Sequence, residues 1–265
     1  MTKVDYPIIT LTTDFGLEGP FIATMKGVIL TINPQVTIVD VTHQIRTHRV
    51  REAAFLIRSV EPYFPRNSLH VVVVDPGVGS ERRPLLVVTE RSMLVGPDNG
   101  VLSPFFRDEG CRVYHITAEK FFLSPVSATF HGRDIFAPCA AWLSTGIKPV
   151  AVGPEVHDPV RLDLPIPHRV DDGAIRGEIL YIDHFGNLIT NISADLLRES
   201  NLPSPVVRLA QHRVRGGLRC YEECPPGSLG ALINSWGLLE IFAPQQNAAK
   251  LLNVDVGEPV RVEAA

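Results

Sequence analysis

The chain has 265 residues, of which 45% are hydrophobic and 20% are charged. This length suffices for one large domain or two modest ones, and the composition excludes a disordered chain. The formal net charge is −4, so no overall positive field attracts a phosphate backbone, and we expect no nucleic-acid partner. The longest apolar runs, such as residues 69–74, are far shorter than the roughly 20 residues that cross a bilayer, so we expect no membrane association.

The N-terminal segment MTKVDYPIITLTTDFG lacks the apolar run and cleavage site of a secretion signal, so we expect a cytoplasmic protein. Its four cysteines, Cys111, Cys139, Cys220 and Cys224, are too scattered for a disulfide framework. The pair in CYEEC lacks both the two-residue spacing and the second ligand pair of a typical zinc site. We therefore expect reduced thiols and no bound metal.

Strand-like and helix-like runs alternate from residue 7 to about residue 155, which is typical of a layered α/β domain. The run LHVVVV is apolar on both faces, which favours a central, parallel strand covered by helices. The apolar spacing predicts helices over residues 20–34, 49–64 and 133–146. Strands are predicted over residues 7–13, 36–42, 69–74, 84–90 and 92–96.

Residues 157–173 contain Pro159, Pro165 and Pro167, which predicts an extended connection rather than a core element. We expect an N-terminal domain over residues 1–160, a linker over 161–173 and a C-terminal domain over 174–265. Many short β-like runs follow the linker, with helical stretches only at 194–200 and 247–252, which predicts a small β-barrel or a sandwich. We interpret the basic runs at 46–52 and 211–219 as solvated faces or subunit contacts.

Two acidic residues directly follow predicted strands, where ligands bind in open α/β sheets. Asp14 follows PIITLTT, and Asp75 follows LHVVVV in the segment DPGVGSERR. The adjacent Arg82 and Arg83 lie close enough in sequence to fold back on Asp75, and His131 precedes the last predicted N-domain helix. Asp, Arg and His in one pocket would suit proton transfer, but each also has a structural interpretation as a turn residue, helix cap or buried group.

Asn99 in VGPDNGVL and Asn187 in DHFGNLITN are first of all turn residues beside glycine. An Asn amide also both donates and accepts hydrogen bonds, so it can match the edge of an adenine base. Either interpretation is compatible with the sequence at these positions.

The motifs as a set resemble one enzyme family. TTDFG, VTIVDVTHQI, VVVVDPGVGSERRPL, VGPDNGVL, TFHGRDIFAP, IDHFGNLITNI, INSWGLLEIF and NAAKLL follow one another in the order and spacing of the S-adenosylmethionine (SAM) hydroxide adenosyltransferases, relatives of fluorinase and chlorinase. The resemblance extends from about Ile8 to Val262. It implies an N-terminal α/β domain with a mostly parallel sheet joined to a C-terminal β-barrel.

This resemblance implies that water splits SAM into adenosine and L-methionine. By motif, Asp75, Arg82 and His131 match the set that positions and activates the water. Halide-using relatives carry a tyrosine where this chain has Asp75, which disfavours a halide-dependent reaction. A non-catalytic adenosine or SAM sensor on the same fold would need the binding residues but not these three side chains.

The resemblance also implies a set of substrate contacts. Asp14 matches a ribose-binding carboxylate, Asn187 an adenine contact, and Asp183 and Ser235 methionine contacts, with Asp183 pairing with the ammonium. We add Asn99 and Ala248 to the predicted binding site on the same basis. SAM is then the substrate, no further cofactor is expected, and a homotrimer with its sites at subunit interfaces is implied.

The sequence departs from its relatives at three places. Relatives often carry a second Asp after TDFG, where this chain has Glu18, Gly19 and Pro20. Trp236 replaces a fluorinase-like arginine, and His48 replaces a tryptophan that covers the ribose. These changes affect the amino-acid and ribose contacts rather than the predicted reaction.

Overall fold

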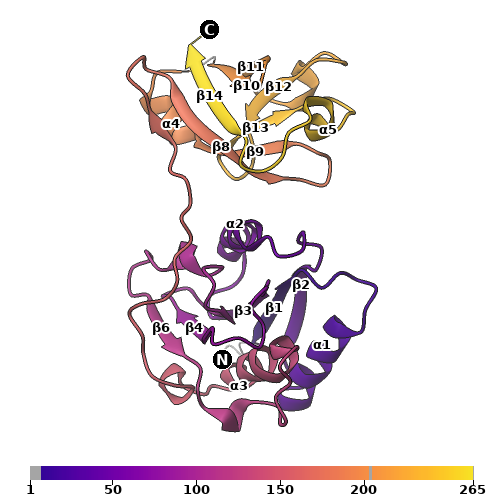
Figure 1. Ribbon diagram of the computed structural model, residues 1–265, viewed down its shortest axis with the longest axis vertical. Helices are drawn as coiled ribbons and strands as arrows, with labels where there is room; N and C mark the ends of the chain where they lie inside the picture. The colour runs from indigo at the N-terminus through magenta and orange to yellow at the C-terminus, as the bar shows by residue number, and fades with distance from the viewer. Residues whose placement is uncertain (1–6, 203–204, 265) are drawn as a thin grey trace, which may run out of the picture. The chain divides into compact units, whose positions relative to one another are not determined.

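The computed structural model describes residues 7–202 and 205–264. The chain divides into two compact units, with the division between Leu162 and Asp163 (Figure 1). This division falls inside the segment 161–173 that the sequence indicates as a linker, while the independence of the two domains stays a prediction. No helix within the described residues is long and apolar enough to cross a membrane.

The first unit is built on a six-stranded sheet of order β2-β1-β3-β5-β4-β6. Strands β1, β2, β3 and β5 run parallel, and β4 is antiparallel to both β5 and β6. The bounds are β1 (Ile8–Thr13), β2 (Thr37–Thr42), β3 (Ser68–Val73), β4 (Pro84–Val88), β5 (Ser92–Pro97) and β6 (Arg112–His115). The mostly parallel sheet is confirmed, but β6 was not predicted, because its polar sequence RVYH shows no strand-like alternation.

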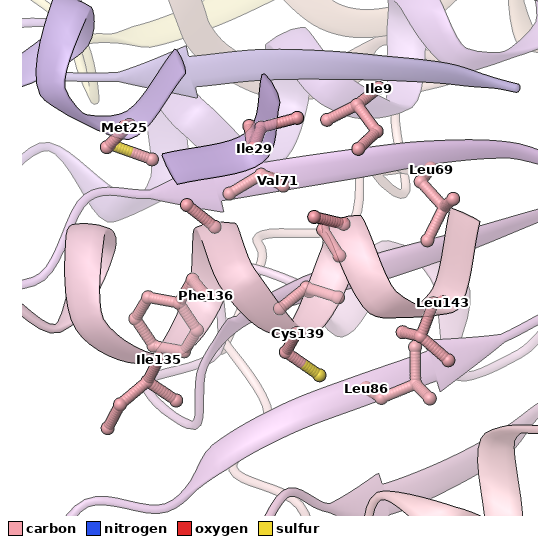
Figure 2. Packing of buried hydrophobic residues seen from close by; sticks show 14 of the residues in the cluster. Ile9, Met25, Ile29, Leu69, Val71, Leu86, Ile135, Phe136, Cys139 and Leu143 are labelled. Atoms are coloured by element: carbon pink, nitrogen blue, oxygen red, sulfur yellow. The ribbon is translucent and has the colours of Figure 1, made fainter. Parts of the chain in front are cut away.

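Strand β3 is central, as predicted: it lies between β1 and β5 and all its residues are buried. Successive side chains of a strand point to opposite faces, and both faces here are buried. Leu69 and Val71 pack with helices α1 (Phe21–Ile32) and α3 (Ala137–Ser144), as Figure 2 shows. Val72 belongs to the core on the other face, with α2 (Val50–Val60). The LHVVVV run is thus explained by helices on both faces.

The last predicted helix, over residues 133–146, is only partly regular. A π-helical turn, η4 (Gly132–Phe136), precedes α3, so the helical hydrogen bonding changes directly after His131. Such turns often occur at functional sites. Shorter 3-10 turns complete the unit at η1 (Glu61–Tyr63), η2 (Ser103–Phe105), η3 (Glu119–Phe121) and η5 (Pro149–Ala151).

The second unit is a closed seven-stranded barrel, which decides between the two predicted alternatives, barrel and sandwich. The ring runs β14-β10-β11-β12-β13-β9-β8 and closes through the pairing of β14 with β8. The bounds are β8 (Ile175–Ile182), β9 (Leu188–Ser193), β10 (Pro205–Leu209), β11 (His212–Leu218), β12 (Gly230–Ile233), β13 (Leu238–Phe242) and β14 (Pro259–Ala264). A two-residue strand, β7 (His168–Arg169), lies within the predicted linker and pairs with β8.

The two predicted helical stretches of this unit are confirmed as α4 (Ala194–Glu199) and α5 (Ala248–Leu252). The side chain of Ser193 caps α4, and that of Asn247 caps α5. A 3-10 turn, η6 (Tyr221–Glu223), lies between β11 and β12.

Strand β11 arises from the basic run 211–219, which the sequence suggested to be a solvated face. Val214 is buried in the barrel, while the flanking Arg213 and Arg215 are exposed. The solvated arginines were anticipated, but they alternate with buried residues, so the segment forms a strand of the barrel.

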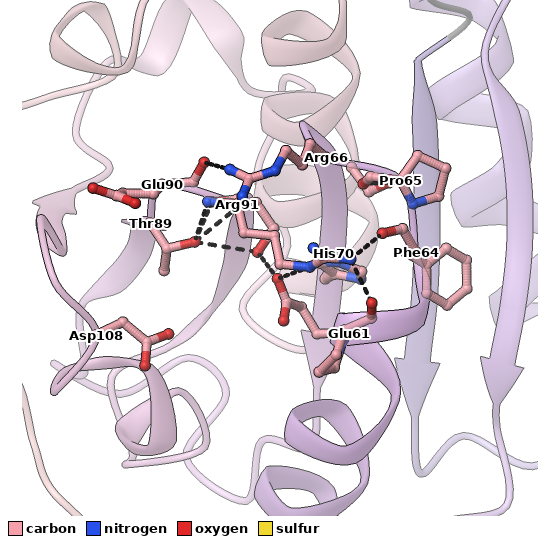
Figure 3. A network of polar contacts seen from close by, with 12 residues as sticks. Glu61, Phe64, Pro65, Arg66, His70, Thr89, Glu90, Arg91 and Asp108 are labelled. Carbon is pink, nitrogen blue, oxygen red and sulfur yellow. Dashed lines mark hydrogen bonds and ion pairs between the residues drawn. The ribbon is translucent and has the colours of Figure 1, made fainter.

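A buried polar cluster lies at the first unit's central strands (Figure 3). The His70 side chain is fully buried, with Nδ1 2.8 Å from the Thr10 hydroxyl and the ring edge-on against Phe64. Arg91 donates to the Phe64 carbonyl, and the Ser92 hydroxyl donates to Glu61. Burial, reinforced by the positive charge of Arg91, lowers the pKa of His70 to about 4. His70 is therefore neutral in the folded protein at physiological pH.

We predict that His70 makes the fold sensitive to mild acid. In the unfolded chain His70 titrates near 6.5, so between pH 6.5 and about 4 the unfolded state binds the extra proton and stability falls as pH falls. The full effect corresponds to about 3 kcal/mol, and to about 2 kcal/mol at pH 5. Denaturant unfolding at pH 7.5 and pH 5 gives the stability that each protein loses on acidification. This loss should be about 2 kcal/mol smaller for His70→Gln than for wild type. The exposed His168→Gln variant is the control, and equal losses in all three proteins would contradict the prediction.

Candidate functional site

Asp75, Arg82 and His131 come together in the first unit. Asp75 follows β3, Arg82 lies in the loop before β4, and His131 directly precedes η4. The Arg82 guanidinium donates from Nε to Asp75 Oδ1 at 3.0 Å and from Nη2 to Oδ2. The same Nη2 lies 2.8 Å from His131 Nδ1. The side chains of Asp75 and Arg82 are only 4% and 8% exposed, so this is a buried, bidentate ion pair beside an imidazole.

The DPGVGSERR loop reaches this geometry because of a glycine. Gly79 has a positive φ of 78°, and a Cβ there would lie 2.2 Å from the Ala128 carbonyl oxygen. Only glycine allows the loop to lie this close to residues 127–130, which lead into His131. The motif glycine therefore brings the arginine loop against the histidine segment.

The hydrogen bonds determine the state of His131. A guanidinium only donates, so Nδ1 of His131 must accept, and the proton of the neutral ring lies on Nε2. Burial, followed by the positive charge of Arg82, lowers the pKa of His131, although Asp75 and Asp134 act in the opposite direction. Arg82 Nη1 is buried and has no hydrogen-bond partner among the residues described. The cluster thus contains an unused donor, and such a buried group ordinarily finds a partner.

Arg83 does not join this cluster, contrary to what the double arginine suggested. Its guanidinium donates to Asp98 at 2.7 Å and to Asp158 at 2.8 Å. The side chains of Arg82 and Arg83 reach different partners, because consecutive side chains of an extended segment face opposite sides. Arg83 fastens residues 158–160 to the sheet, and only Arg82 binds Asp75.

Asp14 lies at the same edge of the sheet as Asp75. Thr13 pairs with Val73 in the parallel register of β1 and β3, so both carboxylates follow neighbouring strand ends. The Asp14 carboxylate accepts from the His48 main-chain N–H at 3.0 Å. The hydroxyl of the preceding residue, Thr13, lies 2.9 Å from His43 Nδ1.

Asp183 and Asn187 form one turn in the barrel unit. The Asn187 main-chain N–H donates to Asp183 Oδ1 at 2.8 Å, and its side-chain amide donates to Oδ2 at 3.0 Å. Gly186, between them, has a positive φ of 87° and lies directly against Asn247, the cap residue of α5. The structure therefore joins the predicted binding motifs IDHFGN and NAAKLL.

Two hollows in this unit share Asp183 and Tyr221 in their linings. The larger hollow, about 640 Å³, contains Phe185, Asn187 and Phe242 in its wall. The smaller hollow, about 380 Å³, contains Ser235, Trp236 and Glu240. The predicted adenine contact thus lines one hollow and the predicted methionine contact Ser235 lines the other.

Two further predicted site residues are engaged within the fold. Asn99 donates to the Val74 carbonyl at 2.8 Å and accepts from the Val101 N–H at 3.1 Å, which fastens its loop to the end of β3 beside Asp75. Ala248 is fully buried at the start of α5. Both lie next to predicted site residues, and their contact with substrate stays a prediction.

The sequence did not indicate three polar residues near these sites: the buried Asp134 and Glu240, and the exposed Tyr221. Asp134 is fully buried and accepts from the Ser127 N–H, which holds the segment before His131. Glu240 is buried on β13 within LLEIF, and a lone charge in an apolar strand was the available signal. Within the described residues, no group of three or more His, Cys, Asp or Glu side chains is placed to hold a metal ion.

Comparison with known proteins places the chain in a family. The family profile of the SAM hydroxide adenosyltransferase N-terminal domain matches residues 9–153, and that of the C-terminal domain matches residues 177–261. A Salinispora arenicola protein named (R)-S-adenosyl-L-methionine hydrolase is 38% identical, with 97% of this chain and 98% of that one covered. A protein of the same name from Thermus thermophilus is 36% identical, with 94% and 97% covered.

More distant relatives and a solved structure agree with this placement. A fluorinase from Actinoplanes sp. is 28% identical over 74% of this chain and 75% of its own. The crystal structure of an uncharacterized conserved protein from Thermotoga maritima superposes with a TM-score of 0.90 at 32% identity, covering 96% of this chain and 99% of that one. The chain belongs to the SAM hydroxide adenosyltransferase family.

Proposed function

We propose that this protein hydrolyses S-adenosyl-L-methionine to adenosine and L-methionine through attack of water on C5′. The observation that carries the proposal is the buried Asp75–Arg82–His131 cluster with its unpartnered donor, Arg82 Nη1. Four relatives named (R)-S-adenosyl-L-methionine hydrolase, at 34–38% identity over nearly the whole chain, support the same reaction. The relatives named fluorinase are less similar, which supports water rather than halide as the nucleophile.

In the proposed step, the water oxygen forms a bond to C5′ while the C5′–S bond breaks. The bonding electron pair goes to sulfur, so the sulfonium becomes the neutral thioether of methionine, and the water loses one proton to the enzyme. Because a positive charge disappears at the reacting centre, exclusion of bulk water from the site favours the step. The difficulty is the nucleophile, since free water has a pKa of about 15.7.

We assign the proton to Asp75. The lone pair of His131 Nδ1 is occupied by the Arg82 guanidinium, so the imidazole offers only its Nε2 proton as a donor. Each Asp75 oxygen receives one guanidinium contact and keeps a lone pair that can accept from water. Arg82 Nη1 and His131 Nε2 then orient the water and stabilise the developing hydroxide.

We propose that the remaining predicted residues bind the substrate. Asp14 would accept from the two ribose hydroxyls, Asn187 would bind adenine in the larger hollow, and Asp183 and Ser235 would bind the methionine end in the smaller one. The catalytic residues belong to one unit and the last three to the other. We therefore propose a cytoplasmic homotrimer in which the α/β unit of one chain and the barrel of a neighbouring chain form each site. SAM is the substrate, and the proposed step needs no additional cofactor.

We predict that Asp75→Asn and His131→Ala each lower turnover at least about 100-fold, because base and electrostatic contributions are commonly of that size. Initial rates of adenosine formation, with circular dichroism to verify folding, provide the measurement. The adjacent arginines are a matched pair: Arg82→Lys should lose activity to a similar extent, whereas Arg83→Lys should stay within a few-fold of wild type. A folded Asp75 or His131 variant with near wild-type activity would show that its assignment is wrong.

Hydrolysis in oxygen-18 water tests which bond breaks. Attack of water on C5′ places the solvent oxygen in the 5′-hydroxyl of adenosine, while methionine leaves as an unlabelled thioether. Mass spectrometry of the products should show labelled adenosine and intact methionine. Unlabelled adenosine, or methylthioadenosine as a product, would refute the step, and binding without turnover would indicate the sensor function.

Light scattering at the assay concentration tests the assembly. We predict the mass of three chains, because the family resemblance implies a trimer, and the division of the predicted catalytic and binding residues between two units supports a shared site. Full activity in a sample with a monomer mass would exclude the trimeric site.

A further inference from the structure

The smaller hollow of the barrel unit carries more negative charge than the predicted substrate contacts account for. Besides Asp183, its wall contains Glu240, which is only 4% exposed. One basic residue, Arg219, also lines the hollow, but its side chain is 90% exposed and binds Glu223 at 2.8 Å. Two carboxylates therefore face a cavity whose single cation is engaged elsewhere.

Glu240 is held by neutral groups alone within the part of the chain described. Its Oε1 accepts from the Tyr221 hydroxyl at 2.8 Å, and Oε2 accepts from the Asn234 side-chain amide at 3.2 Å. Burial raises the pKa of Glu240; the two hydrogen bonds act in the opposite direction, and the negative charge of Asp183 raises it further. A buried carboxylate is usually paired with a cation, so its position at a cavity wall favours a cationic ligand.

Tyr221 fixes the position of this carboxylate. Its ring packs edge-on against Phe242, with centroids 4.8 Å apart, and its hydroxyl donates to Glu240. Burial, together with the hydrogen bond to Glu240, raises the pKa of Tyr221 to about 12, so the hydroxyl keeps its proton. Tyr221 lines both hollows, so Tyr221 and Glu240 lie where the two hollows adjoin.

We propose that Glu240, together with Asp183, binds the α-ammonium group at the amino-acid end of the substrate, and that Tyr221 positions Glu240 for this contact. The inference rests on the proposed function, because Asp183 and Ser235 assign the smaller hollow to that end of the molecule. Glu240 is then a specificity residue: it favours ligands with a free ammonium over adenosine, which has none.

The chemistry distinguishes the ammonium from the other cation of the substrate, the sulfonium. The ammonium keeps its charge throughout the reaction, so a carboxylate beside it stabilises bound substrate and transition state equally and lowers KM alone. A carboxylate beside the sulfonium would oppose the step in which that charge disappears, and its removal would raise kcat. The split between KM and kcat therefore reports which cation Glu240 faces.

Glu240→Gln in the full chain provides the test, since it removes the charge and keeps the shape. We expect KM for SAM to rise at least about 10-fold, the size of a hydrogen bond to a charged group, with kcat within about twofold of wild type. Calorimetry should show an equal loss of affinity for L-methionine and no change for adenosine. Glu263→Gln is the matched control, because it removes the same charge from β14, where Glu263 pairs with Arg208, and should change neither quantity.

Three results would overturn the inference: unchanged methionine affinity, a parallel loss of adenosine affinity that marks a merely structural role, or a raised kcat. Thermal unfolding shows whether Glu240→Gln is folded. If it is not, Glu240→Asp provides a second variant: it withdraws the carboxylate by one methylene and should weaken methionine binding but not adenosine binding. If wild type does not hydrolyse SAM, the proposed function fails. The methionine and adenosine titrations still decide the role of Glu240.

Discussion

The ion pair between Asp75 and Arg82 is the interaction on which the proposed chemistry of this protein depends. A carboxylate at the end of a buried strand and a guanidinium on the following loop are both removed from water, and each is tolerable there only because of the other. Losing one partner of such a pair typically costs about 3–5 kcal/mol, so the loop is held against β3 by strong electrostatics. The guanidinium also fixes the tautomer of His131, so one interaction organises all three side chains.

The fold supplies this interaction through two features of the first unit. Helices cover both faces of the sheet and bury all of β3, and Asp75 comes where this buried run ends. Gly79 lets the loop approach Ala128 and so brings the arginine beside the histidine segment. The π-helical turn that begins at Gly132 and the buried Asp134 hold that segment from the other side.

The barrel unit contributes groups of a different kind. Its hollows are lined by aromatic rings and by the carboxylates of Asp183 and Glu240, which suit a ligand with a flat base at one end and a positive charge at the other. In the proposed reaction, the first unit carries the groups that act on water, and the barrel carries the groups that recognise the shape and charge of the substrate. Under this proposal, the departure at Trp236 concerns recognition in the barrel and not the Asp75 cluster.

The alternation of strands and helices, the central strand LHVVVV and the order of the motifs could be predicted from the sequence, because they depend on local periodicity and on glycine and proline. Strands β6 and β11 were missed, since each carries few buried residues among charged and histidine side chains and only pairing with neighbours makes them strands. Asp75, Arg82 and His131 could be named from their motifs, but the choice of Arg82 over Arg83 and the proton on Nε2 of His131 needed the tertiary contacts. Glu240 and Tyr221 are 19 residues apart and carry no motif that links them. The pairing of β12 with β13 brings them to one cavity, because hydrogen bonds between distant residues follow from strand pairing and not from local sequence.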